Sequence, residues 1–174
     1  MLRLLCGLVV MMALGGCQYI GVTSTQLSGI KNLFFSAEVD VQAAQWALRY
    51  GGYSVEVTPV TVDGGIAFVN NNDVINFDGW MITKVSGLES FIPAWEIAVE
   101  GGARRFTVNG YLAATHQCQP WVEIKTDSGL RYEQQCFASR SYTNSILVDN
   151  LGQVTDIKQV VDSTLKLMHL RLIK

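Results

Sequence analysis

The sequence predicts an all-β, mainly antiparallel domain, and three observations support this. Many short segments alternate apolar and polar residues with a period of two, as strands with one buried face do. These segments recur about every 8–12 residues, a spacing typical of sandwiches and barrels. Turn-forming clusters such as Asp63-Gly64-Gly65 and Asn70–Asp73 separate them. We therefore expect a curved meandering sheet or incomplete barrel with a short N-terminal helix.

The first residues are typical of a signal peptide. Arg3 supplies a positive charge, and residues 4–14 form an apolar run too short to span a bilayer. Leu14-Gly15-Gly16-Cys17 resembles a bacterial lipobox, in which a leucine and two small residues precede the cysteine that receives the lipid. An ordinary signal peptide or a short buried helix with a chance cysteine is the alternative. The lipobox resemblance implies cleavage before Cys17 and stable anchoring through several acyl chains.

Under this interpretation, residues 1–16 are the signal peptide, 17–24 a lipidated tether, and 25–174 a single β-rich periplasmic domain. Gln18 follows the cysteine where an inner-membrane protein would have Asp. By similarity to enteric sorting rules, this implies an anchor at the periplasmic face of the outer membrane.

Two helical segments are expected near the start of the domain. Apolar residues at helical spacing predict a helix over about 25–35, with Ser24 or Thr25 as its N-cap. Three alanines favour a second helical turn over 41–47, which ends near Gly51-Gly52.

The rest of the chain is predicted to form strands. Residues 53–58 alternate with period two, and Pro59 breaks this strand or places it at an edge. Asp78-Gly79 predicts a tight hairpin between 74–77 and 80–85. Strands are also expected at 60–62, 66–69, 95–100, 104–112, 119–126, 130–138, 142–149, 153–161 and 164–173. A terminal helix is the alternative for the last segment.

The cysteines predict one disulfide. Cys6 is removed with the leader and Cys17 is lipidated, which leaves Cys118 and Cys136 in an oxidising periplasm. A predicted hairpin around Asp127-Ser128-Gly129 places these two roughly opposite each other. A metal or redox pair is the alternative, but the sequence has no CxxC motif and His116 alone cannot complete a metal site.

Charge and motifs narrow the possible functions. Removal of the leader changes the formal net charge from −2 to −3, because Arg3 is lost. The sequence shows no basic stretch, so we expect no nucleic-acid partner. It also lacks nucleotide-binding, metalloprotease and hydrolase motifs, so we expect neither enzymatic activity nor a cofactor or catalytic metal.

The residues that could still carry chemistry are few. His116 has no orienting acid in its local pattern, and His169 fits a core or face position of the last strand. A glycosidase pair is the alternative to solvent-facing positions for four carboxylates, namely Glu96, Glu100, Glu123 and Glu133. Eight aromatic residues could form a sugar- or lipid-binding surface. The alternative, favoured for most of them, is that they pack in the core. They are Tyr50, Tyr53, Trp80, Trp95, Tyr111, Trp121, Tyr132 and Tyr142.

Three stretches resemble the YjbF/GfcB family of lipoproteins, which is encoded with group-four capsule and exopolysaccharide export genes. The first runs from Asn32 through Asp40-Val41 to Leu48-Arg49-Tyr50, and the second is the Asn76–Leu88 hairpin. The third is Tyr142–Val154, followed by Lys158-Gln159 where the family has a serine-x-glutamine step. Trp80 and Leu147 differ from the family's usual arginine and tryptophan.

The resemblance implies a non-enzymatic outer-membrane lipoprotein that assists exopolysaccharide or capsule export or assembly. Its partners would be the membrane, through the N-terminal lipid, and polysaccharide export proteins or the glycan itself. The alternative is a ligand-binding or assembly lipoprotein of another envelope pathway. That alternative needs a continuous apolar patch or cavity formed by residues such as Trp95, Tyr111 and Trp121.

Overall fold

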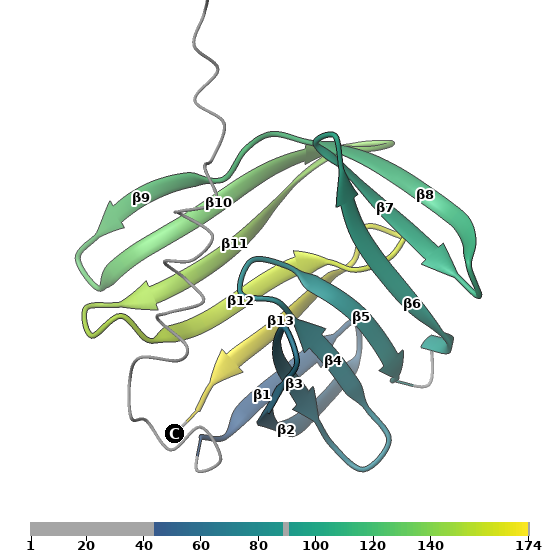
Figure 1. The fold of residues 1–174 in the computed structure, drawn as a ribbon. Helices are drawn as coiled ribbons and strands as arrows, with labels where there is room; N and C mark the ends of the chain where they lie inside the picture. The colour runs from purple at the N-terminus through teal and green to yellow at the C-terminus, as the bar shows by residue number, and fades with distance from the viewer. Residues whose placement is uncertain (1–43, 89–90, 174) are drawn as a thin grey trace, which may run out of the picture.

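Residues 44–88 and 91–173 are described by the structure, a computed structural model. Within them the chain forms a single antiparallel sheet of 13 strands (Figure 1). The strands are β1 (Trp46–Tyr50), β2 (Tyr53–Val62), β3 (Gly65–Val69), β4 (Val74–Phe77), β5 (Ile82–Gly87), β6 (Phe91–Glu100), β7 (Ala103–Val108), β8 (Tyr111–Cys118), β9 (Val122–Thr126), β10 (Gly129–Phe137), β11 (Ser141–Asp149), β12 (Val154–Val160) and β13 (Leu167–Leu172).

The sheet closes on itself into a 12-stranded barrel. Most neighbouring strands are consecutive in the sequence, including β10 and β11, while β13 pairs back to β1 and β8 pairs with β10. The β9 strand lies outside the ring and pairs with β10 alone. The predicted all-β antiparallel class is therefore confirmed, and the sheet is a closed barrel rather than an incomplete one.

The barrel closes at a short seam between β8 and β10. Only two residue pairs join these strands, Cys118 with Cys136 and Gln117 with Phe137. One further backbone hydrogen bond, from Gln119 N to the Gln135 carbonyl at 2.8 Å, supports the seam. The other part of the same β10 edge pairs with β9. Little backbone pairing therefore holds the barrel closed at this point.

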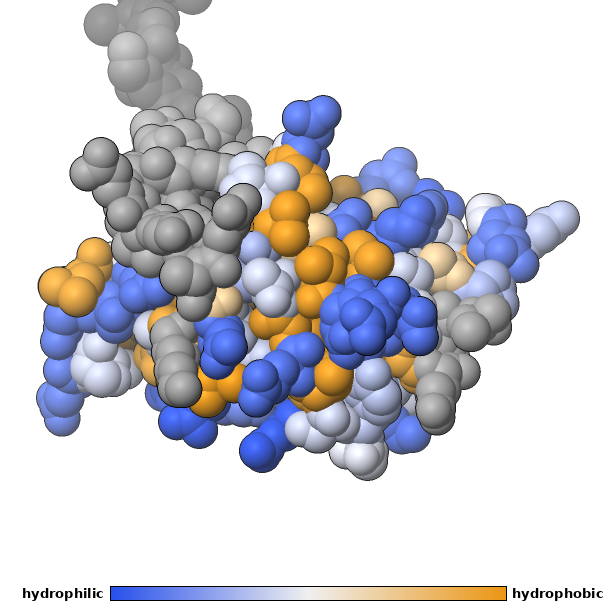
Figure 2. Space-filling view, turned by 90° about the horizontal axis from the view of Figure 1, so that it is seen from below, coloured by the Kyte–Doolittle hydropathy of each residue, from blue (hydrophilic) through white to orange (hydrophobic). Residues whose placement is uncertain are grey.

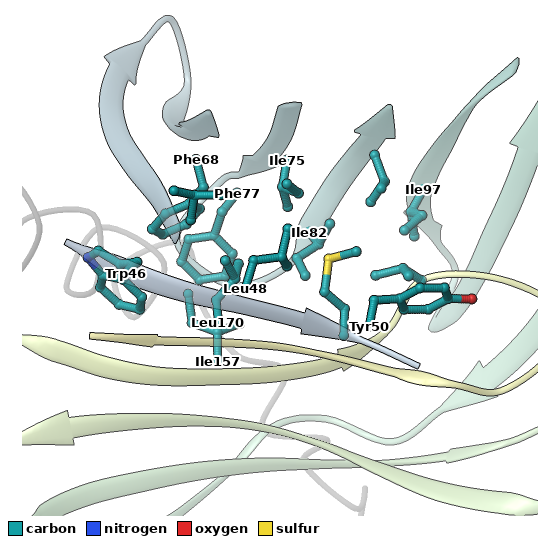
Figure 3. Close-up of a cluster of buried hydrophobic side chains, with 14 of the residues drawn as sticks. Trp46, Leu48, Tyr50, Phe68, Ile75, Phe77, Ile82, Ile97, Ile157 and Leu170 are labelled. Atoms are coloured by element: carbon teal, nitrogen blue, oxygen red, sulfur yellow. The ribbon is translucent and has the colours of Figure 1, made fainter. Parts of the chain in front are cut away.

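Side chains fill the interior of the barrel. Along β1, for example, Trp46, Leu48 and Tyr50 are buried while Arg49 between them is exposed, as the strand period requires. Figure 3 shows these side chains meeting large apolar groups from β3, β4, β5 and β12. The outer surface is mixed: the side seen in Figure 2 carries a band of apolar groups among hydrophilic ones.

Two predicted elements were wrong. The helical turn expected over 41–47 is contradicted at its end, because Trp46–Tyr50 is a strand between β2 and β13. Pairing on both sides outweighs the alanines' helical propensity. The single strand expected over 104–112 is two strands, because Asn109 and Gly110 take positive φ values of 52° and 78° and form a hairpin turn.

Other expectations have clear outcomes. The last segment is the strand β13, so the alternative helix is wrong. Pro59 lies within β2 and pairs with Phe68 on β3, so it does not break the strand; it lies beyond the part of β2 that pairs with β1, as the edge alternative predicted. The expected helix over 25–35 and the tether lie outside the described residues.

Candidate functional site

The two mature cysteines form the predicted disulfide. Cys118 and Cys136 are bonded and lie directly opposite each other at the β8–β10 seam. Cys136 is fully buried, and Asn144 Nδ2 lies 3.5 Å from its sulfur. The bond therefore joins the two strands at the place where backbone pairing is weakest. Cys17, the predicted lipidation site, lies outside the described residues.

A network of buried polar side chains crosses the interior beside this seam. Gln159 on β12 accepts hydrogen bonds at its Oε1 atom from Ile82 N at 3.0 Å and Arg104 Nη2 at 3.3 Å. Its Nε2 atom donates to the Trp80 carbonyl at 2.8 Å. Asn144 on β11 accepts from Val160 N at 3.0 Å. The network ties the β4–β5 hairpin and β7 to the β11–β12 hairpin.

Arg104 is the most unusual member of the network. It is 1% exposed, and burial lowers the pKa of its guanidinium to about 10, so it stays charged at neutral pH. Its Nη2 atom also donates to the Val160 carbonyl at 3.2 Å. Its Nε and Nη1 atoms have no hydrogen-bond partner among residues 44–88 and 91–173. A buried charge with incomplete hydrogen bonding lowers the stability of a fold.

His116 lies next to Arg104, on the neighbouring strand. Its Nδ1 atom is 2.8 Å from the Tyr142 hydroxyl, and its ring stacks at a tilt on Phe106 with 4.5 Å between centroids. Burial, followed by the nearby Arg104 charge, lowers the His116 pKa, and burial raises the Tyr142 pKa to about 12. His116 is therefore neutral and Tyr142 protonated at pH 7, which makes this pair a hydrogen-bonded part of the core.

The lowered pKa of His116 predicts a loss of stability in mild acid. Unfolded His116 takes up a proton near pH 6.5, whereas the folded state resists protonation. The contribution of neutral His116 to the free energy of unfolding is thus fully present above that pH and falls as the pH drops below it, by up to about 1.4 kcal/mol per pH unit. Urea unfolding between pH 7.5 and 5 should show a shallower loss for His116→Asn than for the wild-type protein. Parallel curves for the two proteins would contradict this assignment.

His169, in contrast, lies on the outer face of the barrel. Its Nε2 atom is 2.6 Å from Asp156 Oδ2 on β12, and Lys158 Nζ is 3.4 Å from the other oxygen of the same carboxylate. Two shallow hollows, of about 390 and 280 Å³, open beside His169 and share Arg171 and Leu172 as lining residues. The prediction of a face position for His169 is confirmed.

The four predicted carboxylates contact separate partners near the surface. Glu96 and Glu100 form ion pairs with Lys84 and Arg105, at 3.2 and 2.5 Å. Glu133 pairs with Arg131 at 3.1 Å. Glu123 accepts a hydrogen bond from the Tyr132 hydroxyl at 3.1 Å.

Most of the eight aromatic side chains named from the sequence lie in the core or pack against it, so the core interpretation is confirmed for them. Trp80 contacts Trp121 and Tyr132, with ring centroids 5.6 and 5.3 Å apart. Tyr111 is 79% exposed at the start of β8, whereas Trp121 follows the end of that strand. Eight residues of strand span roughly 25 Å. Trp121 and Tyr111 therefore lie on different parts of the molecule, whereas Trp95 lies in the same cross-strand row as Tyr111, because each is opposite Val108 on β7.

Sequence reasoning missed Arg104, Asn144 and Gln159. The alternation within Ala103–Val108 places Arg104 on the same side as buried Phe106, and this was the available signal. In the part of the chain that the structure describes, no group of three or more His, Cys, Asp and Glu residues could hold a metal ion. The same residues include no helix long and apolar enough to cross a membrane.

The barrel is of a kind already seen in a solved bacterial lipoprotein structure. That structure is the hypothetical lipoprotein YmcC from Escherichia coli K12. The two share 13% sequence identity and superpose with a TM-score of 0.50, over 85% of this chain and 95% of the other. At this identity the likeness shows a shared fold. No protein-family model matches the sequence, and no curated protein matches it significantly.

Proposed function

We propose that this protein is a lipid-anchored cell-envelope protein that assists exopolysaccharide or capsule export or assembly by binding rather than by catalysis. The Leu14-Gly15-Gly16-Cys17 pattern supports the anchor. The fold shared with a hypothetical lipoprotein is consistent with it. The disulfide fits an oxidising compartment such as the periplasm, and Gln18 favours the outer membrane.

One observation carries the proposed link to the YjbF/GfcB family. Two of the stretches that resemble the family are the β4–β5 and β11–β12 hairpins, and Gln159 belongs to the step after the second. The fully buried Gln159 side chain bonds to Ile82 N and to the Trp80 carbonyl in the first hairpin. The family-like segments thus contact one another through one buried amide. This favours a shared structural role for them over chance similarity.

A binding role is supported by how the candidate groups are arranged. His116 bonds to a protonated tyrosine, and His169 bonds to a carboxylate on the outer face. General acid–base or nucleophilic catalysis needs a base within reach of a reacting group in a cleft. His116 is buried and lacks such a setting, whereas His169 lines a surface hollow, where we propose that it contributes to binding.

The anchor and the pathway are tested together in a deletion strain of the source bacterium. We expect loss of the gene to lower secreted polysaccharide severalfold and wild-type protein to restore it. Cys17→Ala should abolish palmitate labelling and fail to restore secretion, because an unlipidated domain leaves the membrane. Cys6→Ala is the matched control, since it removes a leader cysteine outside the lipobox.

Two results would count against the proposal. Palmitate labelling that survives Cys17→Ala would refute the anchor. An unchanged glycan profile in the deletion strain would refute the export role.

A further inference from the structure

Four basic side chains gather on the outer face of β1, β12 and β13, which lie side by side (Figure 1). His169 pairs with Arg49 on one side and with Lys158 on the other, so these three form a row. Arg171 lies two residues along β13 and therefore points the same way. The intervening Leu170 is fully buried inside the barrel. Directly opposed side chains lie about 5 Å apart, so the four form one basic face.

One carboxylate, that of Asp156, lies within the basic face and already bonds to two of its basic side chains. Asp156 is opposite Arg171 and bonds to His169 and Lys158, at 2.6 and 3.4 Å. Its side chain is 15% exposed, against 45% for Lys158. Asp156 therefore holds two neighbours in position and is poorly placed to neutralise an additional cation.

Arg49 and Arg171 are the two arginines of this face. Both side chains are exposed, and neither forms an ion pair with a carboxylate among the described residues. The next acidic group in these rows is Glu56 on β2, opposite Ala47 rather than opposite either arginine. The basic face is thus locally positive on a chain whose formal net charge is −2.

The surface here is hollowed rather than flat. Two adjacent hollows of about 390 and 280 Å³ share His169, Arg171 and Leu172. Lys158 and Asp156 line the first, and Arg49 lines the second. Leu147 and Ile173 add apolar wall to one hollow each. Their sizes lie near the lower end for small-molecule sites, and each has both cationic and apolar walls.

We propose that the basic face binds an acidic polysaccharide, with one sugar unit in each hollow and carboxylate groups against Arg171 and Arg49. This inference deepens the proposed function and rests on it for the choice of a glycan. Guanidinium groups bind carboxylates through paired, charge-assisted hydrogen bonds. Two neighbouring hollows that share one arginine suit a polymer with a repeating anionic unit.

The shape favours a chain-like ligand over a lipid surface. Sugar rings present both C–H faces and acidic groups, so they match the mixed walls of the hollows. A bilayer surface is broad and would touch the rim of such hollows without filling them. Binding should weaken with added salt, because exposed charges are screened.

The test uses the full mature, lipidated chain in non-ionic detergent, with a short oligogalacturonate as the probe. We expect saturable binding to oligogalacturonate and none to a neutral malto-oligosaccharide of equal length. Arg49→Gln combined with Arg171→Gln should weaken binding roughly tenfold or more, because two charge-assisted contacts are lost. Both arginines are exposed, so an unchanged melting temperature will show that the variant is folded.

A matched control removes the same charge elsewhere. Arg105 and Arg131 are exposed arginines outside the basic face, and Arg105→Gln with Arg131→Gln should change affinity by less than about twofold. Equal weakening by both double variants would overturn the proposal, as would absence of any binding. Binding to phosphatidylglycerol vesicles without binding to oligogalacturonate would assign the face to a membrane and also overturn it.

The binding test of the basic face and the deletion test of the export role can fail independently of each other. If deletion lowers polysaccharide secretion but the Arg49→Gln, Arg171→Gln variant restores it fully, the export role stands and the basic face is refuted. If the oligosaccharide binds specifically but deletion leaves the glycan profile unchanged, the face stands and the export role fails.

Discussion

Replacement of both Cys118 and Cys136 by alanine should lower the free energy of unfolding by about 3 kcal/mol. A disulfide that closes a loop of this size, with a sequence separation of 18, stabilises a fold by about that amount. Here the covalent bond also joins strands that share only two residue pairs. We therefore expect hydrogen exchange to accelerate most around the β8–β10 seam, where the barrel would open first.

Thermal unfolding of oxidised and reduced protein measures this effect. A loss of about 3 kcal/mol corresponds to a drop in melting temperature of roughly 10 °C for a domain of this size. A thiol reductant should lower the melting temperature of the wild-type protein and leave that of the double variant unchanged. Equal melting temperatures for all three samples would show that the seam is stable without its covalent bond.

Gly129→Ala should destabilise the domain by roughly 3 kcal/mol or more, which makes it as severe as loss of the disulfide. A Cβ atom at Gly129 would lie 2.1 Å from the Val148 carbonyl oxygen and 2.8 Å from Asp149 Cα. These are backbone atoms of β11, which pairs with β10 starting at Gly129. The clash can be relieved only by moving paired strands. A φ of 136° adds strain for any residue with a side chain.

Gly110→Ala is the matched control for this experiment. Gly110 also has a positive φ, 78°, but a Cβ atom there would meet nothing within 4 Å. It should therefore cost about 1 kcal/mol, the strain of the backbone alone. Urea unfolding of the two variants isolates the contribution of the close approach. If both lose the same stability, the contact with β11 tolerates a methyl group and the explanation fails.

The local features of the fold were predictable because each depends on neighbouring residues. Asp127-Ser128-Gly129 predicted the β9–β10 turn, and the cysteines placed evenly around it predicted the disulfide that the structure forms. The errors also have local causes. Gly51-Gly52 is a two-residue turn between β1 and β2, and the alanines before it favoured a helix instead. Asn109-Gly110 was overlooked as a hairpin turn, and with it the inward direction of Arg104.

An antiparallel β domain, its disulfide partners and a lipobox-like segment ahead of it can all be recognised from the amino-acid sequence. Alternation, turn residues and cysteine spacing act over a few residues and can be read in order along the chain. The folded arrangement was needed to show that the barrel closes, that Gln159 joins two distant hairpins, and that Arg49 lies in one row with His169 and Lys158. Gln159 and Ile82 are 77 positions apart, and Arg49 is still farther from His169 in the sequence, so pairing between remote strands sets these contacts. Local residue patterns do not encode which remote strands will pair.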